Sequence, residues 1–284
     1  MRHLSGMAEI AAEYDGFIVD LWGVLHDGVT AYPGAIDCLT RLKAAGKRIV
    51  LLSNAPRRAA PAAAAMAVMG IDGALYDGLM TSGEATWMML RDRQDPWFAA
   101  LGRRVFHLGP LRDRNVLEGL DYMRVETPAE AEFVLNTGPD DEHNPTRLEA
   151  FEPVLAACRE ARLEMVCANP DRVVIRDRVR VLCAGALAER YQELGGVVRS
   201  MGKPDPAIYA PVMAMLGLPR ARSLAIGDAL ETDIAGAAAA GIASAWVMGG
   251  IYGARLNGEP GVAEELAELA GLSPVATLPG FFWS

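Results

Sequence analysis

Short apolar runs alternate with segments of helical periodicity along most of the chain. Near the beginning, the runs at Phe17–Leu21 and Lys47–Leu52 predict strands, each followed by a helical pattern that stops at a glycine. Near the end, the runs at Ser223–Ile226 and Ala243–Met248 predict strands in the same kind of arrangement. Strands that alternate with helices of this length are typical of α/β folds with a parallel sheet.

The middle of the chain carries a second set of alternating elements. Its predicted strands and long helix lie at Arg104–Leu108, Glu132–Asn136, Pro145–Arg162 and Glu164–Cys167. Pro96 and Gly195 lie at the two boundaries between this middle segment and the flanking parts of the chain. We therefore predict an α/β fold with a doubly wound, parallel-sheet (Rossmann-like) core at 1–90 and 196–284, and an inserted α/β cap domain at 91–195. On the pattern alone, one continuous sheet is the alternative.

Composition narrows the range of partners. Of the 284 residues, 51% are hydrophobic and 22% are charged, which predicts a packed core. A net charge of −9 argues against nucleic acid or an anionic membrane as the main partner, because both need a basic face. The four cysteines form no CxxC pair, and no uninterrupted apolar stretch reaches 18 residues. We therefore expect reduced thiols and a location in the cytoplasm.

Carboxylates end two of the predicted strands. Asp20 closes the first strand, and Asp228 follows the strand that ends near Gly227, with Asp233 five residues further on. Ligands bind outside the carboxyl ends of parallel strands, and neighbouring carboxylates there suit Mg²⁺. Considered alone, Asp20 is more readily a cap or turn residue, whereas this alternative is weaker for Asp228 and Asp233, because Gly227-Asp228 directly ends an apolar strand.

Two further segments place polar groups in comparable positions. Ser53 and Asn54 follow a buried strand and can donate hydrogen bonds to a phosphate oxygen. Lys203 precedes a proline-started helix and can neutralise an anion. Turn formation and solvent exposure are the alternatives for these residues taken separately. The interpretation depends on the order of the four segments along the chain.

In this order the four segments resemble the haloacid dehalogenase-like hydrolase superfamily, and the insertion between the second and third resembles its class IIA branch with a large α/β cap. Further matching segments are His26-Asp27-Gly28, Pro33-Gly34-Ala35, Thr81-Ser82 and Cys167-Ala168-Asn169-Pro170-Asp171. The similarity spans nearly the whole chain. It implies a Mg²⁺-dependent phosphatase that acts on a small phosphorylated metabolite, and it is compatible with a homodimer formed through the cap.

The resemblance also implies a role for each matching residue. Asp20 matches the nucleophile that forms an aspartyl phosphate, Ser53 matches a phosphate-oxygen donor with Asn54 beside it, and Lys203 matches the neutralising cation. The implied metal site consists of Asp20, the backbone carbonyl of Trp22, Asp228 and Asp233, where Asp233 orients the metal's water or Lys203. In the cap, Asn169 and Asp171 are the candidate substrate contacts, with a plain turn as the alternative.

One position departs from the family pattern. Phosphatases of this family carry a second aspartate two residues after the nucleophile, where it acts as general acid and base, and this chain has Trp22 there. Loss of positioned acid–base help costs roughly 10²–10⁴ in rate. The rate of hydrolysis should fall most for alkyl phosphate esters and least for aryl, acyl or anhydride phosphates. His26 and Asp27 are alternative proton donors in the same segment.

Three hypotheses follow from this substitution. The favoured one is a phosphohydrolase that is slow or specialised for good leaving groups. The second is a carbon–halogen hydrolase, because dehalogenases of this superfamily have an aromatic residue at the same position and halide leaves without a proton. The third is a catalytically impaired protein that binds phosphate or a phosphorylated metabolite.

Overall fold

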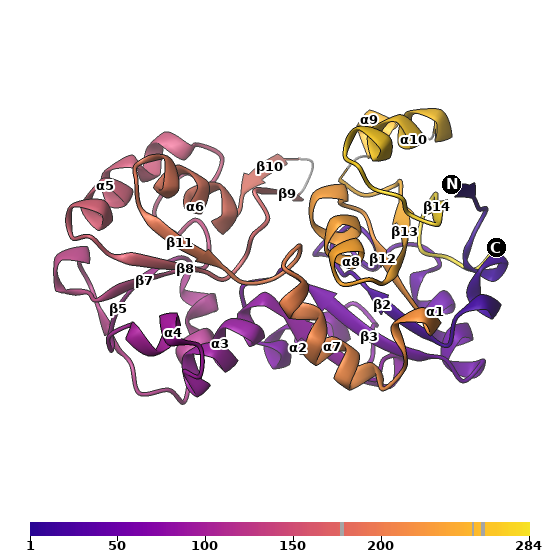
Figure 1. Ribbon diagram of the computed structural model, residues 1–284, viewed down its shortest axis with the longest axis horizontal. Coiled ribbons are helices and arrows are strands. Elements are labelled where there is room, and N and C mark those ends of the chain that lie inside the picture. The colour runs from indigo at the N-terminus through magenta and orange to yellow at the C-terminus, as the bar shows by residue number, and fades with distance from the viewer. Residues whose placement is uncertain (177–178, 252, 257–258) are drawn as a thin grey trace. The chain divides into compact units, whose positions relative to one another are not determined.

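A computed structural model describes residues 1–176, 179–251, 253–256 and 259–284 (Figure 1). They form two compact units. Unit 1 consists of Met1–Ser53, Ala63–Met80 and Lys203–Ser284, and unit 2 of Asn54–Ala62 and Thr81–Gly202. Each unit has its own sheet, so the two are described separately.

Unit 1 contains a seven-stranded sheet in the order β1-β14-β13-β12-β2-β3-β4. Its strands are β1 (Arg2–His3), β2 (Gly16–Val19), β3 (Arg48–Ser53), β4 (Gly78–Thr81), β12 (Ser223–Gly227), β13 (Ala243–Val247) and β14 (Ala276–Leu278). The pairs from β1 through to β3 are parallel. All four residues of β2 are buried, as expected for a central strand covered on both faces.

Unit 1 contains the helices predicted after its strands, together with short helices that the sequence pattern did not predict. They are η1 (Met7–Glu9), η2 (Ala11–Glu13), α1 (Ala35–Ala44), α2 (Ala59–Val68), η3 (Gly73–Leu75), η7 (Pro206–Ile208), α7 (Tyr209–Leu216), η8 (Arg220–Arg222), η9 (Leu230–Ile234), α8 (Ala235–Ala239), α9 (Gly253–Leu256) and α10 (Pro260–Leu269); the first four residues of α2 belong to unit 2. Helix α1 buries Cys38, Leu39 and Leu42, whose spacing places them on one face.

The order of the strands creates a switch point in the middle of the sheet. From β2 the chain adds β3 and β4 on one side, and β12, β13 and β14 lie on the other. The carboxyl ends of β2 and β12 are therefore neighbours, and the backbone N–H of Asp20 donates to the carbonyl of Ile226 at 2.9 Å. In open parallel sheets, ligand sites form at such a switch point.

Unit 2 contains a five-stranded sheet in the order β11-β8-β7-β5-β6, in which every pair is parallel. Its strands are β5 (Arg104–Leu108), β6 (Met123–Val125), β7 (Phe133–Asn136), β8 (Glu164–Cys167) and β11 (Val197–Ser200), and an antiparallel pair is formed by β9 (Val173–Arg176) and β10 (Val179–Leu182). Its helices are α3 (Ser82–Asp92), α4 (Pro96–Ala100), η4 (Leu111–Leu117), η5 (Pro128–Glu130), η6 (Leu148–Phe151), α5 (Glu152–Glu160) and α6 (Ala184–Glu193).

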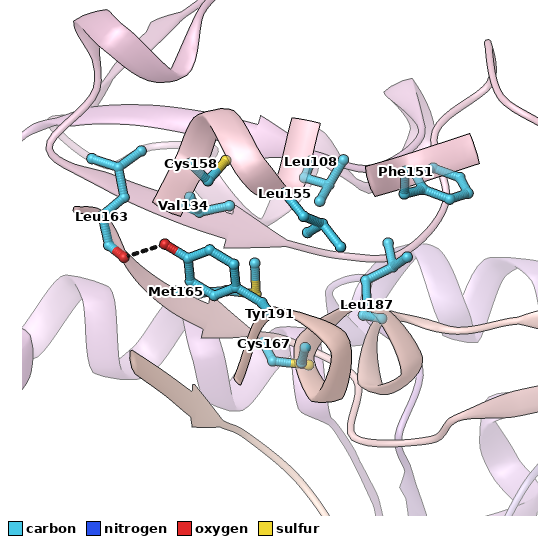
Figure 2. Close-up of a cluster of buried hydrophobic side chains, with 12 residues drawn as sticks. Leu108, Val134, Phe151, Leu155, Cys158, Leu163, Met165, Cys167, Leu187 and Tyr191 are labelled. Carbon is cyan, nitrogen blue, oxygen red and sulfur yellow. Dashed lines mark hydrogen bonds between the residues drawn. The ribbon is translucent and has the colours of Figure 1, made fainter. Parts of the chain in front are cut away.

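The two faces of this second sheet bury different helices. On one face, Val134 and Met165 pack against Leu155 of α5 and Leu187 of α6 (Figure 2). The phenol of Tyr191 closes the same cluster by donating to the carbonyl of Leu163 at 2.7 Å. The other face packs against α3 and α4 through Phe133, Leu135, Val166, Leu90 and Phe98. Side chains alternate between the faces, as the period of two requires.

The α/β fold class with parallel sheets is confirmed, and some element boundaries differ from the sequence pattern. The predicted helix at Pro145–Arg162 is shorter, because α5 begins only at Glu152 after a short turn of 3₁₀ helix. Helix α3 and strand β11, which fall within the predicted core, pack in unit 2. The assignment of 1–90 and 196–284 to a core and of 91–195 to a cap stays a prediction.

Candidate active site

Three aspartate side chains of unit 1 converge at the switch point of its sheet. Asp20 directly follows β2, Asp228 directly follows β12, and Asp233 lies in the short π-helix η9. Each offers a carboxylate oxygen within 4.8 Å of the others, and all three residues are buried. Burial of three carboxylates is costly unless cations accompany them.

Lys203 supplies one of these cations. Its ammonium nitrogen donates to Oδ1 of Asp20 at 2.5 Å, to Oδ1 of Asp233 at 2.5 Å and to the carbonyl of Leu52 at 3.2 Å. The residue is 3% exposed. One ammonium against three ionised carboxylates leaves an excess of two formal negative charges.

The pKa of Asp228 reflects this excess of negative charge. Burial, and next the carboxylates of Asp20 and Asp233, raise the pKa of Asp228 well above its usual range. Its Oδ2 accepts the backbone N–H of Ile251 at 2.6 Å, and its carbonyl accepts the indole N–H of Trp246 at 2.9 Å. A divalent cation among these oxygens removes the repulsion, and Mg²⁺ prefers carboxylate oxygen. The residues present therefore fit Mg²⁺.

Two glycines allow the backbone to approach Asp228 closely. A Cβ atom on Gly23 would lie 2.2 Å from Oδ2 of Asp228, and a Cβ on Gly250 would lie 2.0 Å from the same oxygen. Gly23 also has a φ of 86°, in the left-handed region that favours glycine. Any side chain at either position would displace this carboxylate.

Trp22 belongs to a tight loop after β2. Its indole ring lies edge-on to the imidazole of His26 at 5.8 Å between centroids, and a Cβ on Gly28 would strike the ring at 2.1 Å. Nδ1 of His26 accepts the N–H of Gly28 at 3.0 Å, so neutral His26 carries its proton on Nε2. The loop therefore holds the indole between His26 and Gly28.

Asp27, an alternative proton donor in this loop, is bonded within its own turn. Its Oδ1 accepts the backbone N–H groups of Val29 at 2.9 Å and Thr30 at 2.8 Å. The hydrogen bond from Thr30, together with that from Val29, lowers the pKa of Asp27 below its usual range. A carboxyl group that stays ionised is poorly suited to donate a proton at neutral pH.

The remaining candidate residues fall in different units. Ser53 ends β3 in unit 1, is buried, and follows Leu52, whose carbonyl binds Lys203. Asn54 belongs to unit 2, where its amide donates to Oδ1 of Asp171 at 2.8 Å. Within the same unit, Oδ1 of Asn169 accepts the N–H of Asp171 at 2.9 Å. Substrate binding by Asn54, Asn169 and Asp171 stays a prediction.

The sequence interpretation missed the groups that surround Asp228. Gly250, the backbone of Ile251 and the indole of Trp246 all approach it from β13 and the loop that follows. The glycine pair Gly249-Gly250 directly after a predicted strand was the available signal, because glycine in such a place permits a close backbone approach. Backbone N–H donors cannot be recognised from the sequence, because every residue except proline has one.

Comparison with known proteins agrees with this geometry. A family model described as haloacid dehalogenase-like hydrolase matches residues 17–123, and a related haloacid dehalogenase hydrolase-like model matches 200–269. A haloacid dehalogenase-like hydrolase from Brucella suis 1330 is 33% identical, with a TM-score of 0.84 over 98% of this chain and 99% of that one.

Two further relatives are more distant. Chronophin from Mus musculus is 29% identical over 235 residues, which cover 81% of this chain and 79% of that protein. A glycerol phosphate phosphatase from Mycobacterium tuberculosis, solved in complex with magnesium, is 25% identical with a TM-score of 0.66, covering 88% of this chain and 71% of that one.

The chain belongs to the haloacid dehalogenase-like hydrolase family, and its structural neighbours are of the class IIA type. The predicted recognition and the predicted class of enzyme, a hydrolase, are thereby confirmed. Among the described residues, none of the helices combines the length and the apolar character needed to cross a bilayer.

Proposed function

We propose that the chain is a Mg²⁺-dependent phosphohydrolase that transfers the phosphoryl group of a small metabolite to the carboxylate of Asp20. The observation that carries this proposal is the pair of hydrogen bonds from Lys203 to Asp20 and Asp233. A cation held beside a buried carboxylate at a sheet switch point suits phosphoryl transfer, because that reaction depends mainly on positioning and charge neutralisation.

Asp20 is the proposed nucleophile. One of its oxygens attacks phosphorus in line with the leaving oxygen, and water later hydrolyses the aspartyl phosphate. The ammonium of Lys203 fixes the orientation of Asp20 through Oδ1 and favours its ionised form. Ser53, at the end of the neighbouring strand, is the proposed donor to a phosphoryl oxygen.

Asp20, Asp228 and the backbone carbonyl of Trp22 are the proposed ligands of Mg²⁺. When bound, the ion neutralises negative charge on the carboxylates and on the phosphoryl oxygens. Asp233 accepts hydrogen bonds from Lys203 at 2.5 Å and from the N–H of Ala229 at 3.1 Å. These bonds support a role for Asp233 in orienting Lys203 or a water of the metal.

Trp22 sets the proposed range of leaving groups. An indole cannot protonate a departing alkoxide, and Asp27 is held ionised by its own turn. Leaving groups that need little protonation, such as phenolates and carboxylates, are therefore the favoured ones. The magnesium-bound glycerol phosphate phosphatase and a 4-nitrophenylphosphatase from Thermotoga maritima, both 25% identical, support phosphorylated small molecules as the substrate class.

A metal-independent carbon–halogen hydrolase is the second candidate. The aromatic residue at position 22 favours it, because halide leaves without a proton. The three buried carboxylates argue against it, since a cluster with two excess negative charges is expected to need a divalent cation.

Phosphate release from phenyl phosphate and acetyl phosphate, with Mg²⁺ or with EDTA, tests the proposal. We expect Mg²⁺-dependent release that Asp20→Asn lowers by more than about 10³-fold, whereas Asp37→Asn, at an exposed ion pair of α1, leaves it unchanged. Chloride release from 2-chloropropionate in EDTA would favour the second candidate. Tight beryllofluoride binding without turnover of either ester would indicate a protein that only binds phosphate.

Two further properties belong to the same proposal. We place the protein in the cytoplasm, because the cysteines of the described residues are free and buried, which suits a reducing compartment. A homodimer is proposed from the family resemblance alone, and sedimentation velocity would test it.

A further inference from the structure

Unit 2 contains a positively charged hollow that the proposed reaction does not use. It has a volume of about 470 Å³, within the usual range for small-molecule sites. Its lining residues all belong to this unit and are Leu111, Arg112, Arg114, Asn115, Leu117, Glu118, Tyr122 and Arg124. Three arginines and one glutamate give a formal charge of +2, although the whole chain carries −9.

The shape of η4 explains how the sequence builds this hollow. A 3₁₀ helix has three residues per turn, so side chains three positions apart lie above one another. The column formed by Asp113 and Val116 is buried, with exposures of 1% and 0%. The two remaining columns, which begin at Leu111 and Arg112, line the hollow. Seven residues is long for a 3₁₀ helix, since runs of more than three or four residues are uncommon.

The guanidinium groups are only weakly neutralised by the protein. The guanidinium group of Arg114 forms no hydrogen bond or ion pair with any residue that the structure describes. Arg112 comes no closer than 4.0 Å to Asp113, which also pairs with Arg57 at 3.7 Å. The guanidinium group of Arg124 forms an ion pair with Glu126 at 2.9 Å. This leaves charge available for an anion.

The pKa of a neighbouring histidine, His107, reflects the same excess of positive charge. His107 lies at the end region of β5, and its Nδ1 is buried without a hydrogen-bond partner among the described residues. Burial, then the charges of Arg114 and Arg124, lower the pKa of His107 to about 4.

The walls of the hollow are fixed in place before any ligand arrives. The amide of Asn115 donates to the carbonyl of Arg112 at 2.5 Å, and its oxygen accepts the N–H of Arg58 at 2.7 Å. The hydroxyl of Tyr122 donates to the carbonyl of Leu90 at 3.0 Å and accepts from Arg93 at 2.8 Å. A preorganised site loses less entropy on binding.

We propose that this hollow is a second binding site, which takes a small organic phosphate with an apolar or aromatic group. The phosphate contacts Arg114 and Arg124, since guanidinium groups match phosphate oxygens in pairs. The apolar group covers exposed Leu111 and partly buried Leu117, which both line the hollow. Every residue that lines the hollow belongs to unit 2, whereas the carboxylate cluster belongs to unit 1.

Calorimetric titration of the full chain with AMP and with phenyl phosphate, in EDTA, tests this proposal. We expect saturable binding that the double variant Arg114→Gln/Arg124→Gln weakens by at least about tenfold. Arg220→Gln, which removes one positive charge from an exposed place in unit 1, should leave binding unchanged. Inorganic phosphate should bind more weakly than either ester, because it lacks the apolar group.

Asp20→Asn separates this proposal from the proposed reaction. The second site should bind both esters equally well in this variant, even though its phosphatase activity is lost. Failure of both esters to bind would overturn the second site. Binding that Asp20→Asn abolishes, or that ignores the arginine changes while circular dichroism shows an intact fold, would also overturn it.

Discussion

The ammonium nitrogen of Lys203 lies 2.5 Å from Oδ1 of Asp20, and both residues are buried. Removing one partner of a buried pair leaves an uncompensated charge and costs about 3–5 kcal/mol. We therefore expect Lys203→Met to lower the free energy of unfolding by about that amount in EDTA, measured by urea denaturation.

Lys43→Met is the matched control for this variant. Lys43 pairs with Asp77 at 2.8 Å, but both side chains are partly exposed, so the expected loss is about 1 kcal/mol or less. Equal losses of unfolding free energy in the two variants would contradict the view that burial makes the Lys203 pair more important for stability than the Lys43 pair.

Replacing Trp22 by aspartate should restore proton transfer to the leaving group. We expect Trp22→Asp to raise kcat for glycerol 3-phosphate by about 10²-fold or more, and kcat for phenyl phosphate much less. Steady-state phosphate release measures both. Trp22→Phe serves as the control for losing the indole. If neither rate changes, the missing acid is not the bottleneck.

A methyl group at position 250 should impair the metal site without replacing any of its proposed ligands. In Gly250→Ala the new Cβ would lie 2.0 Å from Oδ2 of Asp228, so this carboxylate must shift. We expect the apparent Kd for Mg²⁺ to rise about tenfold, measured by activation of phosphate release. Gly73→Ala, whose Cβ meets no atom within 4 Å, should leave the Mg²⁺ affinity unchanged.

His107 should make the folded state sensitive to mild acid. Its pKa is about 4 in the folded protein against 6.5 for the ordinary group, so the unfolded chain binds more protons between these values. Stability therefore rises with pH from about 4 to 6.5 and is flat above. At pH 5 the linkage amounts to about 1–2 kcal/mol.

The variant His107→Gln should lose this part of the pH dependence. We expect the difference in unfolding free energy between pH 7 and pH 5 to shrink by that amount, relative to the unchanged chain. His143→Gln, which removes an exposed histidine of the same unit, is the control. An unchanged pH profile in the His107 variant would contradict the assignment.

Local patterns predicted the central parts of the fold well. The strands that end near Asp20, Ser53 and Asp228 are continuous apolar runs, because both faces of a parallel sheet are covered. The pair β1–β14 was not predicted, since it joins residues more than 270 positions apart and each strand is too short for a period. Strands β4 and β11 were also not predicted.

The parts of the candidate site that consist of side chains could be predicted from the sequence. Asp20 and Asp228, which directly follow strands, are brought together with Lys203 and Asp233, as the order of the four segments suggests. Their chemical roles stay predictions. The N–H of Ile251 was not predictable, because a backbone donor is identical at every position except proline.

The order of strands in unit 1 also determines when, during synthesis, β2 can pair with both of its neighbours. Its neighbour β3 is available after residue 53, but its other neighbour, β12, ends only at residue 227. A ribosome adds about 5–20 residues per second, so the open edge of Phe17–Val19 waits roughly 10–40 s for its partner. Unit 2 is complete by residue 202 and can fold first. The nascent chain therefore leaves one edge of this apolar strand open for most of its translation.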